Sequence, residues 1–194
     1  MIRPVVTGIA VLSPVMLIGQ APGVKEGPLG RPFAWTAGKT LFQWFATIGV
    51  AEADFRERVY MAAVCRCFPG KAPKGGGDRV PAPPEIARCS KYLETEARLL
   101  KPRLVIPVGK LAISELGLFG TDKDAKLVDV VGRTVRATLG GVEVDAIALP
   151  HPSGASTWHR MEPGKQLLAR ALTLIEGHPA WRSIRGDDRA MLTA

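Results

Sequence analysis

Residues 14–23 read Pro-Val-Met-Leu-Ile-Gly-Gln-Ala-Pro-Gly, a short apolar run that ends in a glycine-containing turn. The run lies between Pro14 and Gly19, and its length and composition are typical of a strand buried on both faces of a parallel sheet. Ligands of such sheets bind at the carboxyl ends of the strands. We therefore predict a first strand over Pro14–Ile18 and a ligand-binding loop over residues 19–23.

The rest of the chain alternates apolar runs with helical patterns. Further strands are predicted at Val59–Val64, Leu104–Val108 and Val144–Leu149, and the last can form a hairpin with Thr134–Leu139. Apolar spacing predicts helices at Thr36–Ile48, Pro84–Leu100, Gly109–Leu116 and Gln166–Ile175. This order predicts an α/β fold, a three-layer α/β/α sandwich with a mainly parallel four-stranded central sheet, formed by residues 1–194 as one domain.

The composition is that of a globular protein with a basic surface. Of 194 residues, 46% are hydrophobic and 23% are charged, which excludes a disordered tail, a collagen-like repeat and a disulfide mini-protein. The 26 Lys and Arg residues outnumber the 18 Asp and Glu residues, and the net charge of +8 favours a polyanionic partner. A loop over residues 68–84 and a basic tail over residues 178–194 are expected to be flexible.

The cysteine content and the hydropathy of the chain indicate in which cellular compartment the protein is expected. Cys65, Cys67 and Cys89 cannot all pair within the chain, which favours a reducing environment. No run reaches the roughly 18 unbroken apolar residues that a membrane-spanning helix needs. We therefore expect a cytoplasmic protein that does not associate with membranes.

A second motif follows the last predicted strand. Residues 151–156 read His-Pro-Ser-Gly-Ala-Ser. Because the carboxyl ends of parallel strands meet at one edge of a sheet, His151 should face the loop of residues 19–23. An imidazole in that position, beside small hydroxyl residues, is a candidate catalytic group.

The two motifs together resemble those of the uracil-DNA glycosylase superfamily, and the resemblance extends from about Pro14 to Ile175. It is closest to the iron–sulfur type (family 4) and to its covalently capturing relative. The resemblance to this type rests on the Gly-x-x-Pro-Gly loop, the segment Gly30-Arg31-Pro32-Phe33 and the pair Ala37-Gly38. The resemblance implies a DNA repair enzyme that flips deoxyuridine out of DNA and hydrolyses its N-glycosidic bond.

The resemblance also implies roles for individual residues. His151 would donate a hydrogen bond to uracil O2 and stabilise the departing base, and Gln20 would orient the attacking water. The residues implied to bind the base, with Phe33 stacking on it, are Gly19, Ala21, Gly23, Phe33 and Ala63. The residues implied to contact DNA are Ser153, Gly154, Ser156, Arg160 and Lys39.

Two departures from the family pattern concern the chemistry. Relatives carry a carboxylate at the position of Gln20 or Ala21, and Glu26 is the nearest carboxylate in this sequence. Relatives read the uracil edge with an Asn where this chain has Ala63, and the whole chain contains no asparagine. The base must then be read by backbone groups around residues 62–65, or by a side chain such as Arg66 or Gln43.

Two further departures concern the cofactor and covalent capture. The iron–sulfur type uses four cysteines, whereas only Cys67 and Cys89 fall at such positions here, so we expect no metal and no cofactor. The covalently capturing relative carries a His in an Arg-rich insert. The corresponding loop here, Gly70–Pro84, has no His, which argues against covalent capture.

The favoured function is therefore a monofunctional uracil-DNA glycosylase that leaves an abasic site. No lysine lies in either motif, so a strand-cleaving step through a Schiff base is not expected. Two alternatives remain open: a uracil- or abasic-site-binding protein without turnover, and a glycosylase for another deaminated base such as hypoxanthine. The expected partner is uracil-containing DNA in the nucleoid, bound by a monomer with no obligate protein partner.

Overall fold

The computed structural model describes residues 1–73, 77–118, 120 and 126–186. Its sheet contains five strands in the order β2-β1-β3-β5-β4. Their bounds are β1 Val15–Gly19, β2 Tyr60–Ala63, β3 Leu104–Pro107, β4 Thr134–Leu139 and β5 Val142–Ile147. The first four strands in this order run parallel, and β4 pairs antiparallel with β5 as an edge hairpin. The predicted mainly parallel sheet is confirmed, but the predicted number of strands is wrong, because the hairpin strand β4 belongs to the same sheet.

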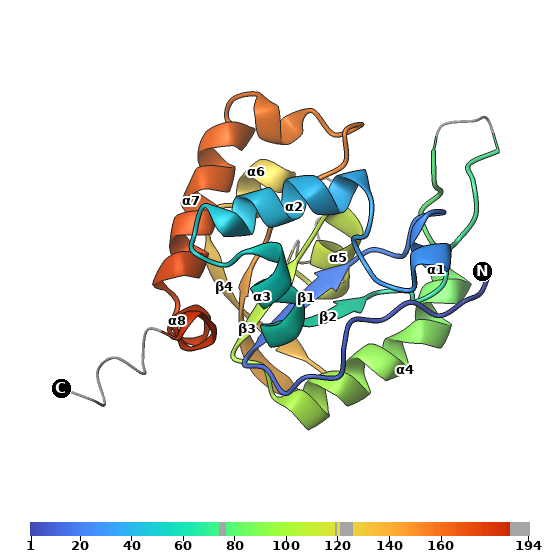
Figure 1. Ribbon diagram of the computed structural model, residues 1–194, viewed down its shortest axis with the longest axis horizontal. Helices are drawn as coiled ribbons and strands as arrows, with labels where there is room; N and C mark the ends of the chain where they lie inside the picture. The colour runs from blue at the N-terminus through green and yellow to red at the C-terminus, as the bar shows by residue number, and fades with distance from the viewer. Residues whose placement is uncertain (74–76, 119, 121–125, 187–194) are drawn as a thin grey trace.

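Helices cover both faces of this sheet (Figure 1). Successive strand residues point to opposite faces, so Val15 and Leu17 join one apolar cluster while Met16 and Ile18 join the other. The first cluster includes residues of α2 Thr36–Ala46, α3 Glu52–Arg58, α6 Leu127–Val130, α7 Gly164–Gly177 and α8 Pro179–Arg185. The second includes residues of α4 Pro83–Leu100 and α5 Lys110–Glu115. The three-layer α/β/α architecture predicted from the sequence is therefore confirmed.

Two short helices complete the fold around the strand ends. Helix α1, Glu26–Leu29, follows the glycine loop, and the 3-10 turn η1, Trp158–Arg160, precedes α7. None of the described helices is long and apolar enough to cross a membrane.

The segment expected to begin a flexible tail at His178 is ordered as far as Arg185. Trp181 of α8 is fully buried, lies 5.3 Å from the Phe45 ring, and donates an Nε1 hydrogen bond of 3.2 Å to the Ile48 carbonyl. Its apolar area anchors α8 to α2, so the expected tail boundary at residue 178 is wrong. Residues 187–194 of the expected tail lie outside the described residues.

Candidate active site

The carboxyl ends of four parallel strands meet at one edge of the sheet. Gly19 at the end of β1 is in register with Ala63 at the end of β2, and Val108 pairs with Leu149 just beyond β3 and β5. A cavity of about 360 Å³ lies at this edge, within the range typical of small-molecule sites. The loops after β1 and β5 both contribute to its lining, so the two sequence motifs meet as expected.

The glycine loop is held from two sides. The Gly19 and Gln20 carbonyls accept hydrogen bonds of 3.0 and 3.1 Å from the backbone N–H groups of Val64 and Cys65. On the other side, the Gly23 N–H donates a 2.7 Å bond to Glu26 Oε2. The backbone that faces the cavity is therefore fixed before any ligand arrives.

Phe33 lies at the floor of the cavity in a constrained backbone conformation. Its φ of 51° lies in the left-handed region, which non-glycine residues seldom adopt. Arg56 stabilises this turn by donating bonds of 2.9 and 3.0 Å to the Pro32 and Phe33 carbonyls. A Cβ on Gly19 would lie 3.0 Å from Cζ of the Phe33 ring, so glycine allows the ring to lie directly against β1.

Glu26 accepts two backbone hydrogen bonds in the lining of the cavity. Its Oε1 accepts a 3.2 Å bond from the Ala34 N–H, and its Oε2 accepts the bond from Gly23. Burial raises the pKa of Glu26 above its ordinary 4.5, while the backbone N–H bonds act in the opposite direction. The carboxylate therefore ties the glycine loop to the segment that carries Phe33.

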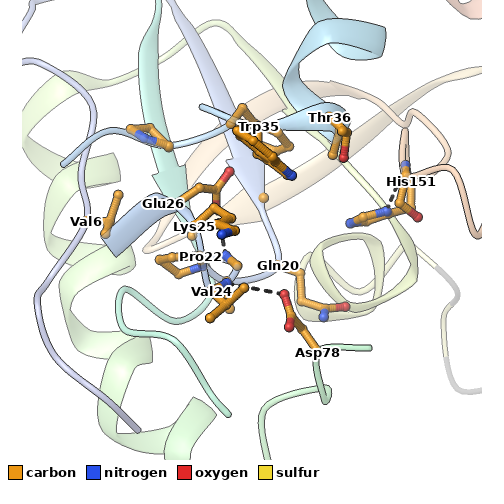
Figure 2. A pocket seen from close by; sticks show the side chains of 18 of the residues that line it. Val6, Gln20, Pro22, Val24, Lys25, Glu26, Trp35, Thr36, Asp78 and His151 are labelled. Atoms are coloured by element: carbon orange, nitrogen blue, oxygen red, sulfur yellow. Dashed lines mark hydrogen bonds between the residues drawn. The ribbon is translucent and has the colours of Figure 1, made fainter. Parts of the chain in front are cut away.

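His151 presents one defined tautomer to the cavity. Its Nδ1 accepts a 3.2 Å bond from the Ser153 N–H, so the proton of the neutral ring lies on Nε2. Burial, with a further contribution from His159, holds the pKa of His151 below its ordinary 6.5. Figure 2 shows the ring projecting toward the space between Thr36 and Gln20. The site thus holds a neutral N–H donor at neutral pH.

The lowered pKa of His151 predicts a pH dependence of stability. As pH falls from 6.5 through the lower folded-state value, the unfolded chain takes up a proton that the folded chain does not, so the free energy of unfolding decreases. We expect the stability of the wild type to fall more steeply over this range than that of His151→Gln. Urea unfolding at a series of pH values measures both slopes, and equal slopes would contradict the assignment.

The structure places every residue predicted to act in catalysis or base binding in the lining of this one cavity: His151, Gln20, Gly19, Ala21, Gly23, Phe33 and Ala63. Of the residues predicted to contact DNA, Ser153 also lines it. Gly154, Ser156, Arg160 and Lys39 lie outside the lining, and Lys39, Gly154 and Arg160 are exposed. Their contact with DNA stays a prediction.

Two side chains proposed as substitute base readers are engaged elsewhere or lie away from the cavity. Arg66 is ion-paired with Glu96, which also accepts a 2.5 Å bond from the Tyr60 hydroxyl. Gln43 is exposed, and neither Arg66 nor Gln43 lines the cavity. The part of β2 that does line it is Met61, Ala62 and Ala63.

Trp35, Lys25 and Asp78 are among the lining residues that the sequence did not single out. Trp35 is half-exposed, and Lys25 Nζ lies 5.7 Å from the centre of its ring. Asp78 reaches the cavity from the loop between β2 and α4, far along the chain from both motifs. Trp35 could have been suspected from its place two residues after Phe33, whereas no local pattern marks Asp78.

The cysteines do not fit the iron–sulfur cluster that the resemblance implies. The chain has three cysteines, Cys65, Cys67 and Cys89, one fewer than the four thiolates of such a cluster, and burial with the neighbouring Cys89 thiol raises the pKa of Cys65 to about 12. Glu85, which also raises that pKa, accepts two 2.7 Å bonds from Arg79. Within the described ranges, no three His, Cys, Asp or Glu side chains are grouped to hold a metal.

Comparison with known proteins finds relatives that cover most of the chain. The chain is 32% identical over 139 residues to the Type-4 uracil-DNA glycosylase of Pyrobaculum aerophilum, covering 72% of this chain and 66% of that protein. It is 29% identical over 139 residues to the Type-4 uracil-DNA glycosylase of Archaeoglobus fulgidus, covering 72% and 65%. The chain thus spans just under two thirds of the length of these relatives.

A family match covers nearly the whole described fold. The model of the uracil DNA glycosylase superfamily matches residues 8–175. This range begins before β1 and ends at Ile175, the last buried residue of α7. The match includes the glycine loop, Phe33 and His151, which the structure gathers around one cavity. The protein therefore belongs to the uracil DNA glycosylase superfamily.

Proposed function

We propose that this protein hydrolyses the N-glycosidic bond of deoxyuridine in DNA, releasing uracil and leaving an abasic site. The observation that carries the proposal is the Nε2–H donor of His151 at a cavity that also contains Phe33 and the backbone of Gly19 and Gln20. Such a cavity suits a flipped, flat base that stacks on one ring and bonds through its edge.

In the proposed reaction, the C1′–N1 bond breaks and negative charge develops on the uracil. The neutral His151 donates to uracil O2, where this charge accumulates, and so stabilises the transition state more than the ground state. Phe33 holds the base plane. Ala62 and Ala63 present backbone groups to the base edge in place of a side-chain amide.

The proposal has three further parts, which concern strand cleavage, the salt dependence of DNA binding and the oligomeric state. Because no lysine lies in either sequence motif, and Lys25 of the cavity lining has its Nζ 5.7 Å from the centre of the Trp35 ring, we expect base release without strand cleavage. The net charge of +8 suits phosphate contacts, so affinity for DNA should fall as salt rises. We propose that the protein acts as a monomer on DNA of the nucleoid.

One observation favours a second candidate, a uracil-binding protein without turnover: neither Gln20 nor Ala21 is a carboxylate. The deciding experiment measures free base released from oligonucleotides that contain a single uracil, hypoxanthine or thymine. We expect release of uracil and no release of thymine. Binding of uracil-containing DNA without release would favour the second candidate, and release of hypoxanthine alone would move the substrate to another deaminated base.

A further inference from the structure

Hydrolysis needs a group that orients the attacking water and accepts its proton, and the glycine loop supplies no carboxylate for this task. Two carboxylates, Glu26 and Asp78, line the described part of the cavity. They come from different loops, and their hydrogen bonds distinguish them.

Glu26 is already committed to the protein backbone. Each of its two oxygens accepts an N–H bond, at 2.7 Å from Gly23 and at 3.2 Å from Ala34. Moving this carboxylate toward a water would release the loop that carries the base-facing backbone. Glu26 is therefore suited to holding the site rather than to proton transfer.

Asp78 has an oxygen with spare capacity. Its Oδ1 accepts a 2.6 Å bond from Lys71, whereas its Oδ2 receives only a long 3.4 Å contact from the Val24 N–H. Asp78 and Gln20 line the same cavity (Figure 2), and the Gln20 side chain makes no hydrogen bond within the described part of the chain. A water placed between them would find an acceptor on Asp78 and an amide on Gln20.

The loop holds Asp78 in place through bonds on both sides of the residue. Ala72 N–H donates 2.9 Å to the Gly77 carbonyl, and Arg79 N–H donates 3.0 Å to the Gly70 carbonyl. Arg79 in turn forms its two-pronged ion pair with the buried Glu85. The carboxylate is thus positioned by a hydrogen-bonded stem, which lowers the cost of arranging it during reaction.

We propose that Asp78 is the catalytic carboxylate that orients and deprotonates the attacking water, with Gln20 as the second partner of that water. This inference rests on the proposed uracil-releasing function. The C1′–N1 bond breaks with its electron pair going to uracil N1, and the water oxygen bonds to C1′. The proton that leaves the water passes to the Asp78 carboxylate and then to solvent.

The test is the single-turnover rate of uracil release by Asp78→Asn at saturating protein. Asn keeps the shape of Asp but cannot accept the proton, so we expect a rate about 10²-fold below wild type with DNA affinity little changed. Asp78→Glu should recover part of the rate. The melting temperature of each variant shows whether the fold is intact.

Lys71→Met is the matched control, since it removes the ion pair of Asp78 but keeps the carboxylate. We expect its saturated rate to stay near wild type. An unchanged rate in Asp78→Asn, or an equal loss in Lys71→Met, would overturn the catalytic role. Both of these results are read against a wild type that releases uracil. A wild type that released no uracil would instead contradict the proposed function.

Discussion

Replacing His151 by alanine is expected to lower the rate of uracil release by about 10²–10³-fold, which is typical of losing one preorganised donor to a developing anion. The bond from Ser153 fixes the proton on Nε2, and the lowered pKa keeps the ring neutral. The donor therefore needs no reorganisation as charge moves onto the base. Single-turnover measurements on a uracil-containing oligonucleotide give this rate.

The loss should fall on chemistry rather than on DNA binding. Phosphate contacts supply a large share of the affinity of proteins for DNA, and the basic side chains predicted to contact DNA here are those of Lys39 and Arg160 rather than His151. His151→Gln keeps an amide N–H donor on a side chain of similar reach, so it should retain more activity than His151→Ala. An unchanged rate in the alanine variant, or a loss explained wholly by weaker DNA binding, would contradict the assigned role.

The sequence predicted much of the fold because parallel strands buried on both faces leave a strong apolar pattern. The run over residues 14–18 corresponds to β1, and Thr134–Leu139 has the predicted bounds of β4. The tail prediction failed because α8 has only seven residues, of which two, Arg182 and Arg185, are basic. Its burial depends on Trp181, which meets Ile48 only through tertiary contact.

The cavity likewise combines residues whose place follows from the order of elements with residues that only tertiary contacts bring there. His151, Phe33 and the glycine loop follow strands directly, so their meeting at one sheet edge was predictable from the order of elements. Asp78 reaches the cavity only because residues 70–72 and 77–79 pair across their loop. Glu26 could be identified as a nearby carboxylate, but its two backbone partners depend on the turn that also gives Phe33 its φ of 51°.

Gly38 is the position where one added methyl group should do most damage to this arrangement. Gly38 is the third residue of α2, and a Cβ on it would lie 1.7 Å from the Phe33 carbonyl oxygen and 2.6 Å from the carbonyl carbon. Both atoms belong to backbone that Arg56 also holds, at 3.0 Å from the same oxygen. Neither α2 nor the Phe33 turn can give way by rotating a side chain, so one of them must move.

Gly38→Ala is therefore expected to destabilise the protein by about 3 kcal/mol, the upper part of the usual cost of overpacking. In a domain of this size, that lowers the melting temperature by about 10 °C. Because Phe33 must shift against Gly19, uracil release should also fall, by about 10²-fold for a displacement near 1 Å. Thermal unfolding and the single-turnover rate measure the two effects separately.

Gly177→Ala is the matched control for the methyl group itself. Gly177 ends α7, has no positive φ, and has no atom within 4 Å of an added Cβ. Alanine is favoured over glycine in a helix by roughly 0.5–1 kcal/mol, so this variant should be as stable as the wild type or slightly more so, with full activity. A Gly38→Ala protein that melted and reacted like Gly177→Ala would show that α2 can move away from Phe33 without cost. The close approach of helix to turn would then play no part in holding the aromatic floor of the cavity.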